Sequence, residues 1–503
     1  MIAPRWLALP IALLLTGAAL PARAFCGFYV SGADAKLSND ATMVVMMREG
    51  TRTVLSMQNS YKGPPEQFAM VIPVPVVLQK ENVKTLPPDI FARVDTLASP
   101  RLVEYWEQDP CPEPELFADN KEGGTGTRAK GEEGSMGSPR NTRPKVVVEA
   151  QFAVGEYEIV ILSASEAGAL DGWLRENGYK IPAGAEAVLR PYVQAGSKFF
   201  VAKVDVEKVV FDGESARLSP LRFHYDTDTF TLPIRLGLLN SNGTQDLLVH
   251  ILAQRQRYEA ANYENVVIPT NLEVSAAVRS RFGPFYAALF DRTLEKHPRA
   301  VVTEYAWGSG SCDPCPGPVL SDNDLRLLGG DVMGKIDTNS MVLTRLHARY
   351  GKESLGEDLV FRTAPGIAGG REGHRTDETK NGAEPSSTNT FQGRYIIRRP
   401  WMGPIECSSP QRGVWGGPPL GMKGAEPRAA SDLGQVTRGG IQLASFLRSD
   451  VAELGVIAAA PPVDTNSRHA VGRLRIGFWL GAALGFLAVA ITFLAERLRR
   501  PFS

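Results

Sequence analysis

The chain has 503 residues, of which 43% are hydrophobic, and its 55 Lys and Arg residues balance 55 Asp and Glu residues. A formal net charge of zero argues against a broad phosphate-binding surface, because affinity for nucleic acids comes mainly from clustered Lys and Arg. We therefore expect no nucleic-acid partner. The apolar fraction excludes wholesale disorder. With 49 Gly and 36 Pro, the chain should contain many turns or linkers rather than a compact helical bundle.

Residues 1–24 have the three parts of a secretory signal peptide. An arginine gives a positively charged start, Trp6 to Leu20 is apolar, and Ala22-Arg23-Ala24 has the small residues that a signal peptidase requires. We therefore expect this segment to be removed and the mature chain to begin at Phe25. The alternative is an uncleaved N-terminal anchor, but the apolar stretch is short for a membrane span and is interrupted by proline.

The mature chain begins with a predicted β-rich unit, residues 25–118. Apolar and β-branched residues from Ala41 to Met47 and from Thr51 to Gln58 flank a Glu-Gly pair, which predicts a tight hairpin. The run from Phe68 to Val77 predicts a further strand, and its two prolines would place that strand at a sheet edge. Apolar residues at helical spacing after Pro88 predict a helix with one buried face.

Residues 119–145 are rich in Gly, Ser and charge, so they predict a flexible insertion. Residues 146–220 follow as an αβ segment. It has three predicted strands, at Val146 to Phe152, Tyr157 to Leu162 and Phe199 to Val204. A helix is expected between the second and the third strand, with a capping box formed by Ser163 and Glu166 and an end near Gly178.

Residues 221–320 repeat several features of the first unit in the same order. The paired motifs are Pro100-Arg101 and Pro298-Arg299, Glu104-Tyr105-Trp106 and Glu304-Tyr305-Ala306-Trp307, and Asp109-Pro110-Cys111-Pro112 and Asp313-Pro314-Cys315-Pro316. The same alignment places Leu55 to Ser60 beside Leu236 to Ser241. Self-similarity in a fixed order indicates a duplicated unit. We expect each unit to run strand, turn, strand, helix and Cys-bearing loop.

The predicted ectodomain ends with residues 321–407, which include a disordered loop near 364–390 of similar composition to the first insertion. Residues 408–475 are predicted to be mainly a linker, with a short helix between Ile441 and Leu454. The fold class is therefore α+β: a β-rich ectodomain with an internal duplication, followed by one C-terminal transmembrane helix.

Residues 476–495 contain one polar side chain, Thr492, and at about 1.5 Å per residue they would cover about 30 Å, one bilayer core. Arginines flank this segment on both sides, so the positive-inside rule leaves its orientation open. The signal peptide decides the orientation, with 25–475 outside the cytoplasm and 496–503 as a cytoplasmic tail. The alternative is a buried core helix, although such helices seldom lack polar residues on every face.

Within the predicted span, Gly477, Gly481 and Gly485 recur every four residues and so lie on one face of the helix. Such a row lets a second helix approach closely, which favours a homodimer through the transmembrane helix. Small residues are also frequent in membrane helices for other reasons, so the alternative is a helix that contacts only the bilayer.

Five cysteines lie in the mature portion: Cys26, Cys111, Cys312, Cys315 and Cys407. Outside the cytoplasm structural disulfides are the default, and five cysteines admit at most two. The duplication suggests Cys26 as the partner of Cys111 and Cys407 as the partner of Cys315, although the sequence leaves the pairing open.

Cys312 and Cys315 also have the spacing of a thiol-disulfide redox site. Such sites usually place the reactive cysteine at a helix N-terminus, and the run Pro316-Gly317-Pro318 disfavours a helix there. A zinc site is less favoured still, because it would need a second ligand pair. Structural bridging is therefore preferred over redox chemistry.

No Gly-rich phosphate loop, nucleophile elbow, EF-hand loop or helical His pair occurs in the sequence. Asp226 and Asp228 beside His224 could hold a cation, but a polar strand edge is favoured. The aromatic residues of the two Glu-Tyr motifs could bind a ligand such as a glycan, although such residues more often fill a core. We therefore predict no catalytic residue, no cofactor and no metal site.

Five segments together resemble a bacterial family known as domain of unknown function 2330. They are Cys26-Gly27-Phe28-Tyr29-Val30, Thr53 to Pro75, Leu102 to Cys111, Arg222 to Leu239 and Cys312 to Pro318. The resemblance covers about Phe25 to Cys407. It implies an exported protein, often with a C-terminal membrane segment, and it implies no established activity, cofactor or catalytic residue.

These patterns predict a membrane-anchored extracytoplasmic protein that is not an enzyme and that binds another envelope protein or a ligand. The alternative is an envelope thiol-disulfide oxidoreductase that uses Cys312 and Cys315. A sensor that binds a ligand would need a partner to signal, because the predicted cytoplasmic tail is short.

Overall fold

The computed structural model describes residues 28–31, 41–58, 68–111, 146–179, 181, 184–212, 215–240, 245–351, 356–371, 381–419, 426–430 and 442–459. The predicted signal peptide, the insertion at 119–145, the transmembrane segment 476–495 and the tail 496–503 lie outside the described residues. Among the helices that are described, none is long and apolar enough to cross a bilayer.

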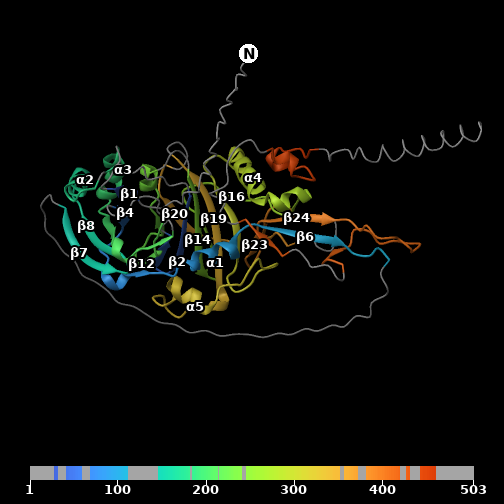
Figure 1. The fold of residues 1–503 in the computed structure, drawn as a ribbon, viewed down its shortest axis with the longest axis horizontal. Helices are drawn as coiled ribbons and strands as arrows, with labels where there is room; N and C mark the ends of the chain where they lie inside the picture. Colours follow the sequence, from blue (N-terminus) through green and yellow to red (C-terminus); the bar gives the residue numbers. More distant parts are fainter. Residues whose placement is uncertain are drawn as a thin grey trace, which may run out of the picture. The chain divides into compact units, whose positions relative to one another are not determined.

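Eleven of the described strands form one mixed sheet. They are β2 (Ala41–Glu49), β3 (Arg52–Met57), β5 (Val83–Thr85), β12 (Leu221–Asp226), β14 (Gln245–Gln254), β16 (Asn265–Val267), β18 (Val301–Gly308), β19 (Met341–Tyr350), β21 (Ile367–Gly369), β22 (Glu384–Pro385) and β23 (Thr390–Gln392). Their order is β22-β21-β23-β18-β19-β14-β2-β3-β12-β5, with β16 beside β18. The chain is therefore β-rich, and its sheet joins strands from distant parts of the sequence (Figure 1).

The predicted hairpin is confirmed, with β2 and β3 antiparallel and Glu49 opposite Arg52. Gly50 has a φ of +54°, a left-handed conformation that glycine adopts without steric cost. Both faces of β2 are apolar and buried, with Val44 and Val45 each fully buried on opposite faces. A strand covered on both sides reads as a continuous apolar run, which is why β2 shows no polar alternation.

Five further strands form a second sheet, in the order β1-β4-β9-β8-β7. They are β1 (Phe28–Ser31), β4 (Phe68–Val74), β7 (Val147–Val154), β8 (Tyr157–Ser163) and β9 (Lys198–Val204). The three strands predicted in the αβ segment are thus confirmed. The edge position predicted for β4 is wrong, because β4 lies between β1 and β9. β1 pairs with β4 only as far as Val71, so Pro73 lies beyond the end of β1 and needs no hydrogen-bond donor on that side.

Two helices cover the second sheet, α2 (Ala167–Glu176) and α3 (Ala185–Gln194). The predicted capping box is wrong: Ser163 ends β8, and its hydroxyl donates to Glu149 at 2.5 Å. Glu166 is the N-cap residue but makes no side-chain cap. The predicted end near Gly178 is confirmed, since Gly178 has a φ of +85° just after the helix.

Apolar side chains form clusters that define four layers. The first cluster fills the space between the two sheets, for example with Met46 and Ile159. A second cluster lies between the five-stranded sheet and helices α2 and α3. The third lies on the far face of the large sheet, under α1 (Asp89–Ala98) and α5 (Asp322–Leu325). The helix predicted after Pro88 is therefore confirmed as α1, with one face buried against the sheet.

A third sheet carries the features that matter most for the candidate site. It consists of β6 (Arg101–Glu107), β17 (Leu272–Glu273), β24 (Arg394–Arg399), β25 (Trp415–Gly416) and β26 (Arg428–Ala429). β6 and β24 run parallel, side by side, from the pair Arg101 and Arg394 to the pair Trp106 and Arg399 (Figure 1). Helix α4 (Phe282–Lys296) packs on this sheet through aromatic contacts.

The remaining described strands are β10 (Val210–Asp212), β11 (Ser215–Arg217), β13 (Thr231–Leu232), β15 (Arg257–Ala260) and β20 (Leu359–Ala364).

The C-terminal part of the described chain differs from the predicted linker at 408–475. β25 and β26 both pair with β6, and Phe446 and Val451 are buried. In place of the helix expected between Ile441 and Leu454 there are two short 3-10 turns. The predicted disordered loop near 364–390 likewise contributes β21, β22 and β23 to the large sheet, while 372–380 lies outside the described residues. Each of these segments has buried apolar side chains among its Gly and Pro residues, for example Phe391, Trp415 and Phe446, which pack it against the rest of the fold.

The internal duplication stays a prediction. In both units a helix leads into a strand that carries the Glu-Tyr motif, α1 before β6 and α4 before β18. The aligned segments at the start differ, however, because Arg235–Asn240 forms a 3-10 helix whereas Arg52–Met57 is β3. Strands of both units also share the large sheet, so the two units do not form separate halves.

A buried network of charges joins α1 and α4 to the large sheet. Glu304 lies at a bulge in β18 and is fully buried, as is Arg345 of β19. The Glu304 carboxylate accepts from Arg345 Nε at 2.6 Å, from His347 Nδ1 at 2.6 Å and from the Tyr286 hydroxyl at 2.5 Å. Arg345 also pairs with Asp95 of α1. Removing one partner from such a network typically costs about 3–5 kcal/mol, because the other charge is left buried alone.

The network sets two opposite pH dependences. Burial opposes ionisation of Glu304, but the charges of His347 and Arg345 outweigh it and lower its pKa to about 2. Burial also disfavours a charged His347, yet Glu304 and Asp246 raise its pKa above 6.5. Glu304 therefore contributes stability that is lost as the pH falls from about 4.5 towards 2. His347 contributes stability that is present below about pH 6.5 and lost as the pH rises through its raised pKa.

We therefore expect the free energy of unfolding to be highest between about pH 4.5 and 6.5. His347→Gln should abolish the fall on the alkaline side and reduce the fall on the acid side without removing it, because Arg345 still lowers the pKa of Glu304. Urea unfolding followed by circular dichroism across this pH range would measure both. His297→Gln is the matched control, because His297 is 41% exposed and pairs with Glu264 away from the network. An unchanged alkaline fall in His347→Gln would show that His347 carries no buried charge.

Candidate functional site

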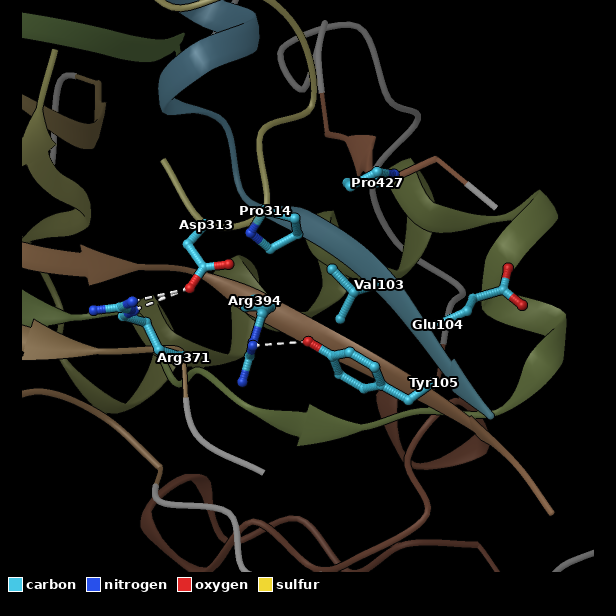
Figure 2. Close-up of a pocket in the computed structure, with 8 residues that line it drawn as sticks. All are labelled: Val103, Glu104, Tyr105, Asp313, Pro314, Arg371, Arg394 and Pro427. Carbon is cyan, nitrogen blue, oxygen red and sulfur yellow. Dashed lines mark hydrogen bonds and ion pairs between the residues drawn. The ribbon is translucent and has the colours of Figure 1, made fainter. Parts of the chain in front are cut away.

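A pocket lies where β6 and β24 meet the loop that follows β18. Its volume is about 280 Å³. Figure 2 shows the eight lining residues: Val103, Glu104, Tyr105, Asp313, Pro314, Arg371, Arg394 and Pro427. They come from five separate parts of the sequence, so the pocket exists only in the folded chain.

The floor of the pocket is built by the parallel pairing of β6 and β24. Alternate residues of a strand point to the same face, so Val103 and Tyr105 lie on the face that Arg394 shares. Arg394 is 2% exposed. It donates through Nε and Nη2 to Asn271 Oδ1, at 3.0 and 2.7 Å, and through Nη1 to the Tyr105 hydroxyl at 3.0 Å. These three hydrogen bonds fix the orientation of the guanidinium.

The loop between Cys312 and Cys315 forms one wall, and buried side chains anchor its backbone. The Gln392 amide donates to the carbonyl of Asp313. Arg101, which is fully buried, donates through Nη1 to the carbonyl of Pro314 at 2.7 Å. Both contacts hold carbonyl groups, so they fix the loop without depending on the disulfide.

Arg371 lies at the mouth of the pocket, just after a glycine that the packing requires. Gly370 has a φ of +76°, and a Cβ there would approach the carbonyl oxygen of Gln392 to 2.0 Å. The Arg371 guanidinium stacks over the Trp307 ring at 5.1 Å and donates through Nη2 to Asp313 Oδ2 at 3.0 Å. The side chains of Arg371 and Asp313 are 47% and 57% exposed, so their ion pair contributes little to stability.

Positive charge dominates the inner part of the pocket. Burial lowers the pKa of Arg101, and the neighbouring charges of Arg394 and Arg345 lower it further. Glu104 points away from the other lining side chains in Figure 2 and pairs with Arg279 and Arg399 outside the pocket. Of the two acidic side chains among the described lining residues, Asp313 is the one that faces the pocket.

Burial raises the pKa of the Tyr105 hydroxyl. The group therefore stays neutral at physiological pH and accepts a hydrogen bond from Arg394. An oriented guanidinium beside a neutral hydroxyl suits the recognition of an acceptor group rather than acid–base chemistry, which needs a group that titrates near the working pH.

Two disulfides are present among the described cysteines, Cys111–Cys407 and Cys312–Cys315. The pairings suggested by the duplication, Cys26 with Cys111 and Cys315 with Cys407, are therefore wrong. The reason is the parallel pairing of β6 with β24, because the chain leaves both strands in the same direction and brings Cys111 and Cys407 together. Their Cα atoms are 5.6 Å apart. Cys26 itself lies outside the described residues.

The structure separates the other predicted candidates. Tyr305 and Trp307 belong to the core cluster under α1, whereas Tyr105 lines the pocket. Asp226 is held by Arg52 through two hydrogen bonds at 2.8 and 2.9 Å, and His224 lies beside Asn82. Within the described ranges no group of three or more His, Cys, Asp or Glu residues is placed to hold a metal ion. The glycine row of the transmembrane segment, Gly477, Gly481 and Gly485, lies outside the described residues.

The disulfide Cys312–Cys315 does not start a helix. The next helix, α5, begins at Asp322, so no helix dipole stabilises a thiolate at Cys312. Cys315 is exposed and Cys312 is half-buried. The arrangement has the spacing of a redox pair without the helix that usually lowers the pKa of its reactive thiol.

Sequence reasoning missed Arg371, Arg394 and Gln392. Arg371 lies in the tract predicted to be disordered, and the pairing of β24 with β6 joins residues almost three hundred positions apart. One local signal was present elsewhere: Arg345, His347 and Arg349 alternate with apolar residues along β19. That period of two predicts a strand with one polar face.

A family model described as an uncharacterized protein conserved in bacteria, DUF2330, matches residues 20–362, more than half of the chain. No curated protein and no solved structure matches the chain.

The two disulfides should differ in their contribution to stability. Cys111–Cys407 joins residues 296 positions apart, and replacing both cysteines with serine should lower the free energy of unfolding by about 2–5 kcal/mol. Cys312–Cys315 joins residues three positions apart, so the same change should cost about 2 kcal/mol or less. Guanidinium unfolding of the full chain would measure both. A larger loss from the short bridge would contradict the anchoring by Arg101 and Gln392.

Proposed function

Because the chain belongs to the DUF2330 family of uncharacterized bacterial proteins, we propose its function from its own residues. It is a membrane-anchored extracytoplasmic protein whose β-rich domain binds another component of the bacterial envelope and catalyses no reaction. The observation that carries this proposal is the pocket on β6 and β24, where Asn271 and the Tyr105 hydroxyl orient Arg394 and Arg371 stands at the mouth. Such a site recognises a ligand without itself reacting.

The placement rests on the two ends of the sequence. Residues 1–24 have the parts of a signal peptide, and residues 476–495 are long and apolar enough for one span. Two disulfides in the described part support an oxidising compartment, because such bridges are rare in the cytosol. Gly477, Gly481 and Gly485 add the proposal of a homodimer through the membrane helix.

Crosslinking in intact cells, followed by purification of the full chain and mass spectrometry, tests the binding function. We expect the same envelope component under several growth conditions, and a crosslinked dimer that Gly481→Ile abolishes. Fractionation of the same cells should recover the chain with the membranes and without residues 1–24. Recovery of the chain alone would contradict a stable partner, and a soluble chain that retains its first residues would contradict the placement.

A second candidate function is thiol-disulfide exchange at Cys312 and Cys315. The exposure of Cys315 favours it, together with the anchoring of the intervening carbonyls by Arg101 and Gln392. In the reduced form the Cys315 thiolate would attack a substrate disulfide and release one substrate thiolate. The Cys312 thiolate would then attack the mixed disulfide, releasing the second thiolate and restoring the bridge.

Trapping distinguishes this candidate from the leading proposal. A Cys312→Ser variant keeps the exposed Cys315 and cannot resolve a mixed disulfide, so it should accumulate one, whereas Cys315→Ser should not. Both variants also carry Cys26→Ser. Of Cys26, Cys312 and Cys315, each variant then keeps only the one thiol that is tested. Detection is by non-reducing electrophoresis of acid-quenched cells. Equal absence of adducts in both variants would reject redox chemistry at this loop.

A further inference from the structure

We propose that the pocket binds its ligand through a carboxylate group, which takes the place that Asp313 now holds opposite Arg371. This inference rests on the proposed binding function and names the chemistry of the ligand. It starts from the two arginines that line the pocket, Arg371 and Arg394. A guanidinium presents a planar fork of donors that matches a carboxylate.

Both guanidinium groups are held in place before any ligand arrives. The Arg371 group stacks on the Trp307 ring, and two hydrogen bonds from Arg394 to the Asn271 amide oxygen fix its plane. The Trp307 ring and the Asn271 amide thus hold the two guanidinium planes in a defined orientation. A preorganised cation loses less side-chain entropy when an anion binds.

The electrostatic surroundings favour an anion over a neutral or cationic group. Arg101 lies fully buried behind Pro314, close enough to Arg394 for the two charges to repel each other. The acidic side chain of Glu104 is engaged by Arg279 and Arg399. Asp313 is then the carboxylate that faces the guanidinium of Arg371 across the mouth, at 3.0 Å.

A ligand carboxylate would replace the Asp313 carboxylate in the exposed ion pair with Arg371. An ion pair with both partners about half exposed contributes little to stability, because solvent screens both charges. A ligand carboxylate that also reaches Arg394 and the Tyr105 hydroxyl gains more, because those groups are buried or half-buried. Asp313 therefore acts as an internal competitor for the site.

The rest of the lining sets the size and the body of the ligand. Val103, Pro314 and Pro427 contribute apolar surface beside the Tyr105 ring. A volume of about 280 Å³ is at the small end of ligand sites. The ligand, or the part of it that enters, is therefore a small apolar group that carries one carboxylate.

Benzoate is the probe, and benzamide is its neutral control of nearly the same shape. Saturation-transfer NMR on the full chain in detergent micelles measures the binding of both. We expect benzoate to bind at least tenfold more tightly than benzamide. Arg371→Gln should weaken benzoate binding about tenfold, whereas Asp313→Asn should strengthen it severalfold, because the internal competitor is gone. Arg362→Gln, which changes an arginine that is 59% exposed and paired with Glu259 on another sheet, should leave binding unchanged.

Several results would overturn the inference. They are equal binding of benzoate and benzamide, no benzoate binding at millimolar concentration, and weaker binding in Asp313→Asn. Binding of inorganic phosphate that depends on Arg371, with none of benzoate, would reject the carboxylate as the recognised group. If crosslinking still recovers a partner in any of these cases, the proposed envelope-binding function remains supported while carboxylate recognition at the pocket is rejected. The two proposals can therefore be rejected independently. Unfolding curves of each variant show whether the fold is intact.

Discussion

The parallel pairing of β6 with β24 is the constraint on which the rest of the site depends. It joins segments separated by almost three hundred residues, and it brings Tyr105 beside Arg394. It also directs the segments that follow β6 and β24 towards the disulfide bridge between Cys111 and Cys407. A parallel pair has no short connection that would hold it in register. Tertiary contacts must do so, and helix α4 and the strands β25 and β26 supply them.

The buried charges of the large sheet lie directly behind this pair. The amide of Gly393 donates to the carbonyl of Glu304 at 2.8 Å, and the amide of Arg101 donates to the carbonyl of Gly393 at 2.9 Å. The residue that holds Arg345 and His347 through its side chain thus holds the start of β24 through its backbone. The ion network and the pocket therefore share one backbone segment, so a change in the network would also alter the floor of the pocket.

Local parts of the fold were predictable from the sequence, and non-local parts were not. The hairpin of β2 and β3, helix α1 and strands β7, β8 and β9 follow from periodicity and turn residues that lie within a few positions of one another. The positions of Arg371 and Arg394 depend on strand pairings between distant segments, for which a single sequence holds no signal. Within the predicted glycan-binding motifs, only the structure separates Tyr105, at the pocket, from Tyr305, in the core.

The long bridge has a consequence for the integrity of the molecule. Cys111 and Cys407 enclose most of the described chain. A protease that cuts once anywhere between them produces two polypeptides, yet these remain one covalent species until a thiol reagent is added. Such a nicked form would keep its N-terminal fragment attached to the part that continues towards the C-terminus. A single cut in this segment would therefore not separate the two fragments.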